Sequence, residues 1–277
     1  MIDLHAHSTA SDGVLSPTEL IQLAVAEGLQ AIALTDHDTV DGLDEAQAAA
    51  EASGIVFVPG IELEIDWQPG VFHLLGLGLK GWTGPLRSRL VRVREYRTER
   101  NLRMVDRMQK AGIAIDYGEL IEIAGHRTVG RPHFAHALLR KGVVASSQEA
   151  FDRFIGNGQP FYESKRALSV GKACATVHAA GGKAVIAHPN TLGLGWDEFS
   201  RTLFRWKHEG LDGIEAYHPN VSLPDAHRFA SLAEELGLIV TGGSDYHGIG
   251  RTDRRLGRSS GGQPIDARFL DPFMEAA

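Results

Sequence analysis

Apolar residues in this chain gather in short runs that are separated by segments of helical character. The runs predict seven strands, at residues 2–5, 30–34, 55–65, 71–79, 183–187, 213–217 and 238–242. Apolar residues recur at helical spacing in the segments 16–27, 41–52, 170–180, 197–209 and 223–236. Strands that alternate with helices in this way are typical of parallel βαβ units, whose strands are covered on both faces. The pattern therefore predicts an α/β protein.

The alternation stops between residues 80 and 165, where no apolar run of the earlier type occurs. This stretch predicts four helices, at residues 86–112, 117–124, 131–142 and 148–155. The first helix is basic, with nine arginine or lysine residues against three acidic residues between positions 86 and 110, in a chain of net charge −7. Such an excess is typical of a surface for phosphate-bearing partners, but a solvated helix with i,i+4 ion pairs is the simpler interpretation. We expect a helical insertion here.

Composition narrows the class of protein. A length of 277 residues suits one large α/β domain with an insertion. No apolar run is long enough to span a membrane, and the first residues lack the pattern of a secretory signal. Cys174 is the only cysteine, so no intrachain disulfide can form, and we expect it to be a small core residue. We expect a cytoplasmic protein.

Residues that commonly bind metals follow the predicted strands where the strands end. His5 and His7 are two positions apart, so they would point to the same side of an extended segment, and Asp12 follows on the next turn. The other such residues are Asp36, His37, Glu62, His73, His188, His218, Asp245 and His247. A closed parallel barrel brings all its carboxyl ends to one mouth, whereas an open sheet brings together only a few. This distribution favours a barrel.

Taken together, these motifs resemble those of the PHP (polymerase and histidinol phosphatase) superfamily. They are Asp-x-His-x-His with Ser8 and Asp12, Thr-Asp-His at 35–37, Gly-Ile-Glu at 60–62, His-Pro at 188–189 and Ser-Asp-x-His at 244–247. The resemblance covers the chain outside the insertion. It implies a distorted (β/α)7 TIM-like barrel formed by residues 1–79 and 166–277, with residues 80–165 as an all-helical substrate lid.

The resemblance also implies two or three divalent metal ions at the mouth of the barrel. The implied ligands are His5, His7, Glu62 and Asp245 for one ion, Asp12, His37 and His247 for a second, and Glu62, His73 and His188 for a third. Mixed imidazole and carboxylate ligands suit manganese, the ion we expect, with iron or zinc as alternatives. Two ions sharing a hydroxide would attack phosphorus without a side-chain nucleophile. The candidates for protonating the leaving oxygen are His247 and His218.

The insertion holds a candidate phosphate site, Gly130-Arg131-Pro132-His133, at the start of a predicted helix. A helix start offers free N–H groups and Arg131 adds a fork of donors, although a packing turn on the lid explains the same residues. The insertion is similar to that of PHP phosphatases that remove the 3′-phosphate from nucleoside 3′,5′-bisphosphates such as adenosine 3′,5′-bisphosphate. In that case Arg131 and His133 would hold the second phosphate. Further candidate substrate contacts are Ser8 and Asn190 and, more weakly, Lys165, Arg166 and Arg251.

Four other functions stay open. Related PHP proteins trim short 5′-phosphorylated RNA from its 5′ end, and others hydrolyse small metabolites such as histidinol phosphate. A regulatory metal-binding PHP domain without turnover should have lost ligands, whereas every motif position here keeps a competent one. An amidohydrolase of similar fold would use a lysine at the end of a middle strand, and none is evident. We expect a small nucleotide or a short RNA as substrate, and neither duplex DNA nor a membrane as a partner; the oligomeric state is left open.

Overall fold

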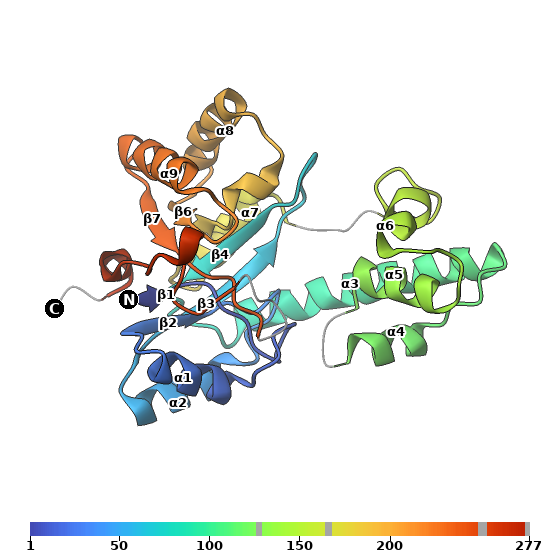
Figure 1. Cartoon of the computed structure of the whole chain (residues 1–277), viewed down its shortest axis with the longest axis horizontal. Coiled ribbons are helices and arrows are strands. Elements are labelled where there is room, and N and C mark those ends of the chain that lie inside the picture. Colours follow the sequence, from blue (N-terminus) through green and yellow to red (C-terminus); the bar gives the residue numbers. More distant parts are fainter. Residues whose placement is uncertain (126–128, 164–167, 249–253, 275–277) are drawn as a thin grey trace. The chain divides into compact units, whose positions relative to one another are not determined.

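The chain divides into two compact units. The computed structural model describes residues 1–125, 129–163, 168–248 and 254–274 (Figure 1). The first unit comprises Met1–Ser88 and Ala167–Ala277, and the second comprises Arg89–Arg166. The division falls inside the long helix α3 (Pro85–Lys110), a few residues beyond position 80, where the insertion was expected to begin.

One seven-stranded sheet forms the centre of the first unit. Its strands are β1 (Ile2–Asp3), β2 (Ala31–Leu34), β3 (Val56–Glu64), β4 (His73–Leu77), β5 (Lys183–Ile186), β6 (Gly213–Tyr217) and β7 (Ile239–Gly242). They lie side by side in chain order, and all neighbours are parallel except at β4, which is antiparallel to both β3 and β5. The predicted number of strands is confirmed. The reversal of β4 departs from an all-parallel barrel, and it places His73 at the start of its strand instead of within or beyond it.

Hydrogen bonds beyond the named strands join the first strand to the last. The backbone N–H of Leu4 donates to Gly242 O (3.2 Å), that of Asp245 donates to His5 O (2.8 Å), and that of His7 donates to Tyr246 O (2.9 Å). These bonds close the sheet into a barrel at the edge where His5 and Asp245 lie. The distorted (β/α)7 TIM-like barrel is confirmed.

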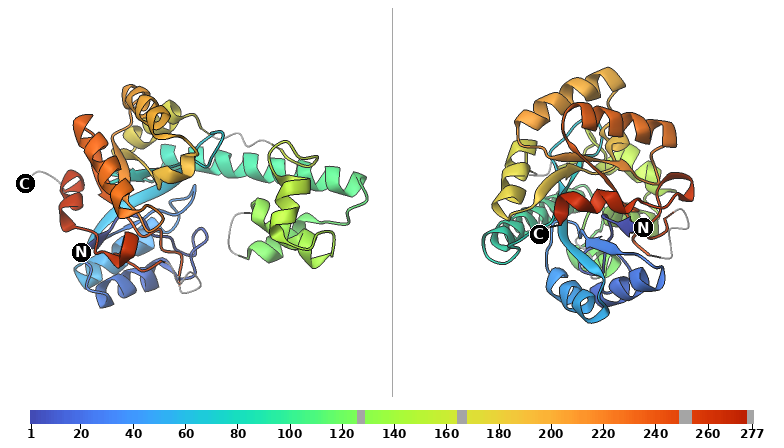
Figure 2. Two further views of the ribbon diagram at one scale, coloured as in Figure 1. Left: turned by 45° about the horizontal axis from the view of Figure 1, so that its top comes forward. Right: turned by 90° about the vertical axis from the view of Figure 1, so that its left-hand side faces the viewer.

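Helices cover the outside of this barrel. Figure 2 shows α1 (Pro17–Ala26) and α2 (Leu43–Ser53) on one side of the strands, and α8 (Trp196–His208) and α9 (Leu223–Glu235) on the other. The remaining helical segments of the unit are α7 (Val170–Ala179) and the 3₁₀ turns η2 (Pro189–Leu192), η3 (Ser260–Gly262) and η4 (Ala267–Phe273). Helix α1 starts with a capping box, in which Ser16 and Glu19 each bond the backbone N–H of the other, followed by Pro17 at the first helical position. The sequence therefore fixes the start of this helix locally.

An apolar cluster fills the barrel below its mouth. It is built from strand residues, with Ile265 and Phe269 added from the C-terminal segment; the strand residues are Ile2, Leu4, Ala31, Ala33, Val58, Leu75, Leu77, Val185 and Ala187. The register pairs Glu62 with Leu75, and Leu75 with Val185, so these three side chains are on one face of the sheet. The carboxylate of Glu62 therefore projects into the barrel interior, directly above apolar residues.

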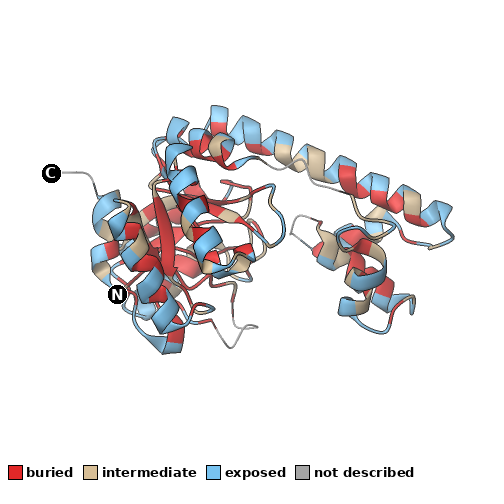
Figure 3. Cartoon of the chain, turned by 90° about the horizontal axis from the view of Figure 1, so that it is seen from above, coloured by how far each residue is buried: buried red, intermediate tan, exposed pale blue. Residues whose placement is uncertain are grey.

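The second unit is helical and has its own core. After α3 come α4 (Tyr117–Ala124), α5 (Arg131–Arg140), α6 (Ser147–Ala150) and a π-helical turn, η1 (Phe151–Ile155), where one continuous helix was expected. Buried residues on the facing sides of these helices form an apolar cluster that includes Met104, Met108, Leu120, Phe134, Leu138 and Ile155 (Figure 3). On α3, ion pairs such as Lys110–Asp106 (2.7 Å) and Arg103–Glu163 (2.9 Å) offset part of the positive charge. No helix among the described residues is both long and apolar enough to cross a membrane.

The single thiol gives a test of the barrel's packing. Cys174, in α7, is fully buried, and burial raises the pKa of its thiol to about 12. Because the thiolate is the reactive species, we expect the folded protein to resist a disulfide reagent such as Ellman's reagent at pH 8. One thiol per chain should react after unfolding in guanidinium. Labelling of the folded protein at the rate of the unfolded chain would contradict the buried position.

Candidate metal centre

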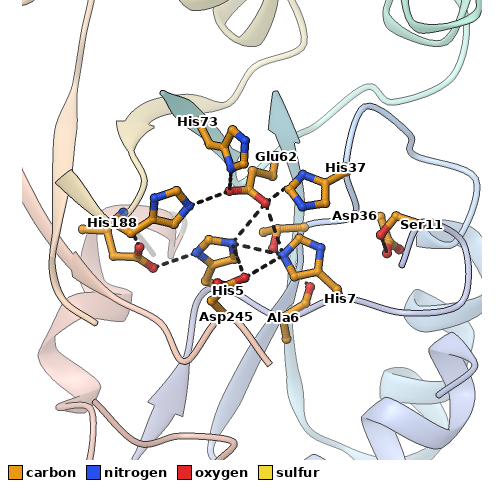
Figure 4. A network of polar contacts seen from close by, with 12 residues as sticks. His5, Ala6, His7, Ser11, Asp36, His37, Glu62, His73, His188 and Asp245 are labelled. Carbon is orange, nitrogen blue, oxygen red and sulfur yellow. Dashed lines mark hydrogen bonds and ion pairs between the residues drawn. The ribbon is translucent and has the colours of Figure 1, made fainter. Parts of the chain in front are cut away.

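One buried carboxylate lies at the centre of the barrel mouth. Glu62 is completely inaccessible to solvent, and its two oxygens are close to five imidazole rings (Figure 4). Its Oε1 is 2.9 Å from His73 Nδ1 and 3.1 Å from His188 Nε2. Its Oε2 is 3.0 Å from His37 Nδ1, 3.2 Å from His7 Nε2 and 3.3 Å from His5 Nε2. Histidines from four separate parts of the chain therefore converge on one carboxylate.

Three groups of side chains in this cluster could each hold a metal ion. Group A consists of His5, His7, Glu62 and Asp245; group B of His7, Asp12, His37 and His247; and group C of His37, Glu62 and His73. Within each group, one candidate ligand atom from every residue lies within 4.8 Å of the others. His7 Nδ1 and Glu62 Oε2 are buried without a hydrogen-bond partner. Buried polar atoms rarely lack a partner, so the residues present fit a bound cation.

The groups largely match those implied by the family resemblance. Group A contains the same four residues as the first implied set. Group B contains the second implied set and His7 in addition. Group C has His37 where the resemblance implied His188. His188 still lies within 3.1 Å of Glu62, so it borders the same site, and its ligand role stays a prediction.

The charges in the cluster favour a cation at this position. Burial disfavours the charged form of His7, but the carboxylates of Asp245 and Glu62 outweigh this effect and raise the pKa of His7 to about 10. Burial also works against ionisation of Glu62, but the surrounding imidazoles, His37 first, keep the pKa of Glu62 well below its usual range. A field that holds a proton on His7 also attracts a divalent cation, which would displace that proton when it binds.

Asp36 fixes the loop that carries Asp12. The Asp36 carboxylate accepts hydrogen bonds from the Ser8 N–H (2.8 Å), the Ser8 hydroxyl (2.7 Å) and the Ser11 hydroxyl (2.5 Å). Asp36 itself belongs to none of the three groups. Ser8 is completely buried with both its amide and its hydroxyl engaged, so its position argues against the expected contact with substrate. Its role is to hold the loop.

Glu215 orients two of the histidines, although it belongs to none of the sequence motifs. His5 Nδ1 is 2.9 Å from Glu215 Oε1, which leaves His5 Nε2 facing Glu62 and Asp245. The other oxygen of Glu215 accepts the backbone N–H of His188 (2.7 Å). A carboxylate behind a ligand histidine fixes the ring and its tautomer. The available signal was a lone acid inside the apolar strand 213–217, where burial requires a partner.

The two candidates for the proton donor differ in their surroundings. His218 is completely buried, its Nδ1 accepts the backbone N–H of Asn220 (3.1 Å), and its Nε2 is 2.8 Å from Arg254 Nη1. Burial lowers the pKa of His218, so this position argues against the expected role as an acid. His247 lies in group B, with Nε2 3.2 Å from Asp12 Oδ1, and its role as an acid stays a prediction.

The candidate substrate residues of the second unit lie together at the start of α5. The Arg131 guanidinium lies over the rings of Tyr162 (5.5 Å) and Phe151 (5.9 Å), two aromatic contacts that the sequence did not indicate. His133 Nδ1 accepts the N–H of Gly130 (2.8 Å) and so caps its own helix.

In the first unit, Asn190 is exposed, and its amide donates to Asn220 O (2.9 Å). The weaker candidates Lys165, Arg166 and Arg251 lie outside the described residues.

Comparisons with known proteins agree with this geometry. The family model described as PHP domain matches residues 3–157. The chain is 37% identical to a 3′,5′-nucleoside bisphosphate phosphatase of Chromobacterium violaceum, over 98% of each chain. It is 36% identical to a 5′-3′ exoribonuclease of Haemophilus influenzae, over 88% of this chain and 89% of the relative. A solved structure of an amidohydrolase from Chromobacterium violaceum, with bound sulfate and no metal, is 35% identical and has a TM-score of 0.80, over 98% of this chain and 96% of that one.

Gly243 offers a test of how tightly the site is packed. A Cβ at this position would overlap His5 Cβ and lie 2.6 Å from Glu215 Oε1, so Gly243→Ala must displace the pair that orients His5. Overpacking of this kind typically costs about 1–3 kcal/mol. We expect a lower unfolding temperature and less bound manganese after purification in its presence. Gly81→Ala is the matched control, because a Cβ there meets no atom within 4 Å. Equal unfolding temperatures and metal contents for the two variants would contradict this packing.

Proposed function

Because the chain belongs to the PHP domain family, we propose that it is a metal-dependent phosphatase that releases the 3′-phosphate of nucleoside 3′,5′-bisphosphates, such as adenosine 3′,5′-bisphosphate. The observation that carries the proposal is the buried carboxylate of Glu62 with five imidazoles around it. The substrate follows from the phosphatase relative, which the chain matches over nearly its whole length.

Two or three divalent ions fit the donor groups, and the proposed ion is manganese, with iron or zinc as alternatives. When bound, the ions would polarise the phosphoryl oxygens and activate a water molecule for in-line attack. Group A is entirely buried, so its residues would hold an ion away from solvent. The side chains of Asp12 and His37 in group B are 36% and 25% exposed, so a phosphate group can reach the centre on that side.

The surrounding residues do not favour an amidohydrolase mechanism that uses a metal-bridging lysine. Every lysine among the described residues is exposed, and none of them could lie among the buried ligands of group A. Cys174 is buried within α7, so a thiol nucleophile is not favoured either. The donor set therefore supports hydrolysis by activated water. The presence of three complete groups also argues against a regulatory domain that has lost turnover.

The second phosphate of the substrate is proposed to bind at Arg131 and His133. The rings of Tyr162 and Phe151 contact the face of the Arg131 guanidinium, and such contacts leave the N–H edges of the fork available to an oxyanion. The same rings support a second candidate function, removal of nucleotides from short 5′-phosphorylated RNA, because bases stack on aromatic side chains. The exoribonuclease relative favours this candidate as well.

Loss of the Glu62 charge should abolish the activity. Glu62→Gln keeps the shape of the side chain but removes the anion shared by groups A and C. We expect the metal content and the phosphate release from adenosine 3′,5′-bisphosphate to fall by at least about 100-fold, because loss of an outer partner of a metal ligand already costs 10–100-fold. Glu51→Gln, the same change at an exposed position of α2, is the control. Full activity of Glu62→Gln would refute the metal centre.

Loss of the Arg131 guanidinium should affect bisphosphates selectively. We expect Arg131→Ala to lower kcat/KM for adenosine 3′,5′-bisphosphate by about tenfold or more, since a charged hydrogen bond contributes roughly 1.5–3 kcal/mol. The same variant should act nearly normally on adenosine 3′-monophosphate, which lacks the second phosphate. Arg140→Ala, at the exposed end of the same helix, is the control. Equal losses on both substrates would mean that Arg131 serves only packing.

A further inference from the structure

We propose that Arg254 is a positioning residue of the metal centre, which turns the carboxylate of Asp245 so that one oxygen faces His5 and His7. Arg254 is buried, with 6% of its surface exposed. It belongs to the segment after the last strand, and no motif marks it in the sequence. The inference rests on the proposed function only in requiring that group A binds a metal.

The two oxygens of Asp245 face different partners. Arg254 Nη1 donates to Asp245 Oδ2 (3.0 Å), while Asp245 Oδ1 lies 3.2 Å from His7 Nε2 and 3.5 Å from His5 Nε2. Arg254 Nη1 also lies 3.1 Å from Ser244 O. The guanidinium thus holds both the backbone before Asp245 and the oxygen that points away from the metal group. A single oxygen is left to bind an ion in group A.

The backbone at Asp245 needs such support. Its φ is +52°, a left-handed conformation that side chains other than glycine rarely adopt. Residues in this region persist only where the surrounding structure holds them, and they are concentrated at functional sites. The Asp245 N–H donates to His5 O (2.8 Å), which fixes the backbone on one side. Arg254 adds a hydrogen bond to the side chain, at the oxygen that points away from His5 and His7.

Asp3 fixes the segment that carries Arg254. The Asp3 carboxylate accepts the N–H groups of His5 (3.1 Å), Ser244 (3.0 Å) and Gly257 (2.7 Å). It therefore ties residues 254–257 to the ends of β1 and β7, where two group A ligands lie. These backbone contacts set the reach of Arg254 toward Asp245. A buried guanidinium close to divalent cations is electrostatically unfavourable for metal binding. Arg254 therefore favours metal binding by orienting Asp245 and not by its charge.

Two substitutions separate orientation from charge. Arg254→Lys keeps the positive charge, but its single ammonium on a flexible stem does not fix a donor at the position of Nη1, whereas Arg254→Gln loses both the charge and that donor. We expect both variants to bind Mn²⁺ at least tenfold more weakly than the wild type in calorimetric titrations, as for other outer partners of metal ligands. The visible absorption of bound Co²⁺ should also change in Arg254→Lys, because the ligand geometry changes. The exposed neighbouring residue supplies the matched controls, Arg255→Lys and Arg255→Gln.

The outcomes distinguish this inference from the proposed function. Wild-type protein that binds no Mn²⁺ would refute the metal centre itself. A second outcome is that the wild type binds Mn²⁺ and that Arg254→Lys has the same affinity and the same Co²⁺ spectrum. This would overturn only the role of Arg254, because a positive charge alone would then suffice. Thermal unfolding of the metal-free proteins shows that each variant is folded at the temperature of titration. If Arg254→Gln does not fold, the affinity and the Co²⁺ spectrum of Arg254→Lys decide the question.

Discussion

The contact on which the site depends is that between the Glu62 carboxylate and five imidazole nitrogens at 2.9–3.3 Å. A carboxylate oxygen and an unprotonated imidazole nitrogen are both acceptors, so they repel one another at this distance unless a proton or a metal ion lies between them. Glu62 is also buried above an apolar core, where an uncompensated charge is costly. Protons or metal ions are therefore needed at the barrel mouth to compensate the charge of Glu62. Groups A and C share this carboxylate, so ions in the two groups would not bind independently of each other.

The path of the chain explains how so many ligands reach one point. In a parallel sheet, only the residues that follow a strand arrive at the mouth. Because β4 is antiparallel to its neighbours, its first residue, His73, arrives at the edge where β3 presents Glu62 and where His188 follows β5. At two of the other strand ends, the backbone turns through a positive φ, at His188 and Asp245. Each such turn costs about 1–3 kcal/mol. Part of the stability of the barrel is thus used to hold ligand residues in place.

The features that could be predicted from the sequence are those that depend on local patterns of residues. The seven strands follow from their apolar runs, the start of α1 follows from Ser16-Pro17, and the positions of the candidate ligands follow from the histidines and acids at strand ends. The sequence did not predict features that depend on long-range contacts. Glu215 lies inside a strand and acts on His5, 210 positions away in the chain. Arg254 is one of several arginines after residue 250, and only the fold shows that it is buried next to Asp245. The direction of β4 was also beyond local pattern, since an apolar strand carries no sign of its direction.

The residues of the candidate metal centre all belong to one of the two units. All residues of groups A, B and C belong to Met1–Ser88 and Ala167–Ala277, together with Glu215, Asp36 and Arg254, which hold them. The helical unit has its own apolar core, and none of its described residues belongs to these groups. In this unit the Arg131 guanidinium lies over the rings of Tyr162 and Phe151, the contacts on which its proposed role in substrate binding rests. Under the proposed function, one metal centre would serve different phosphate esters through changes in the helical unit alone. The two kinds of relative, a nucleotide phosphatase and an exoribonuclease, fit this proposal.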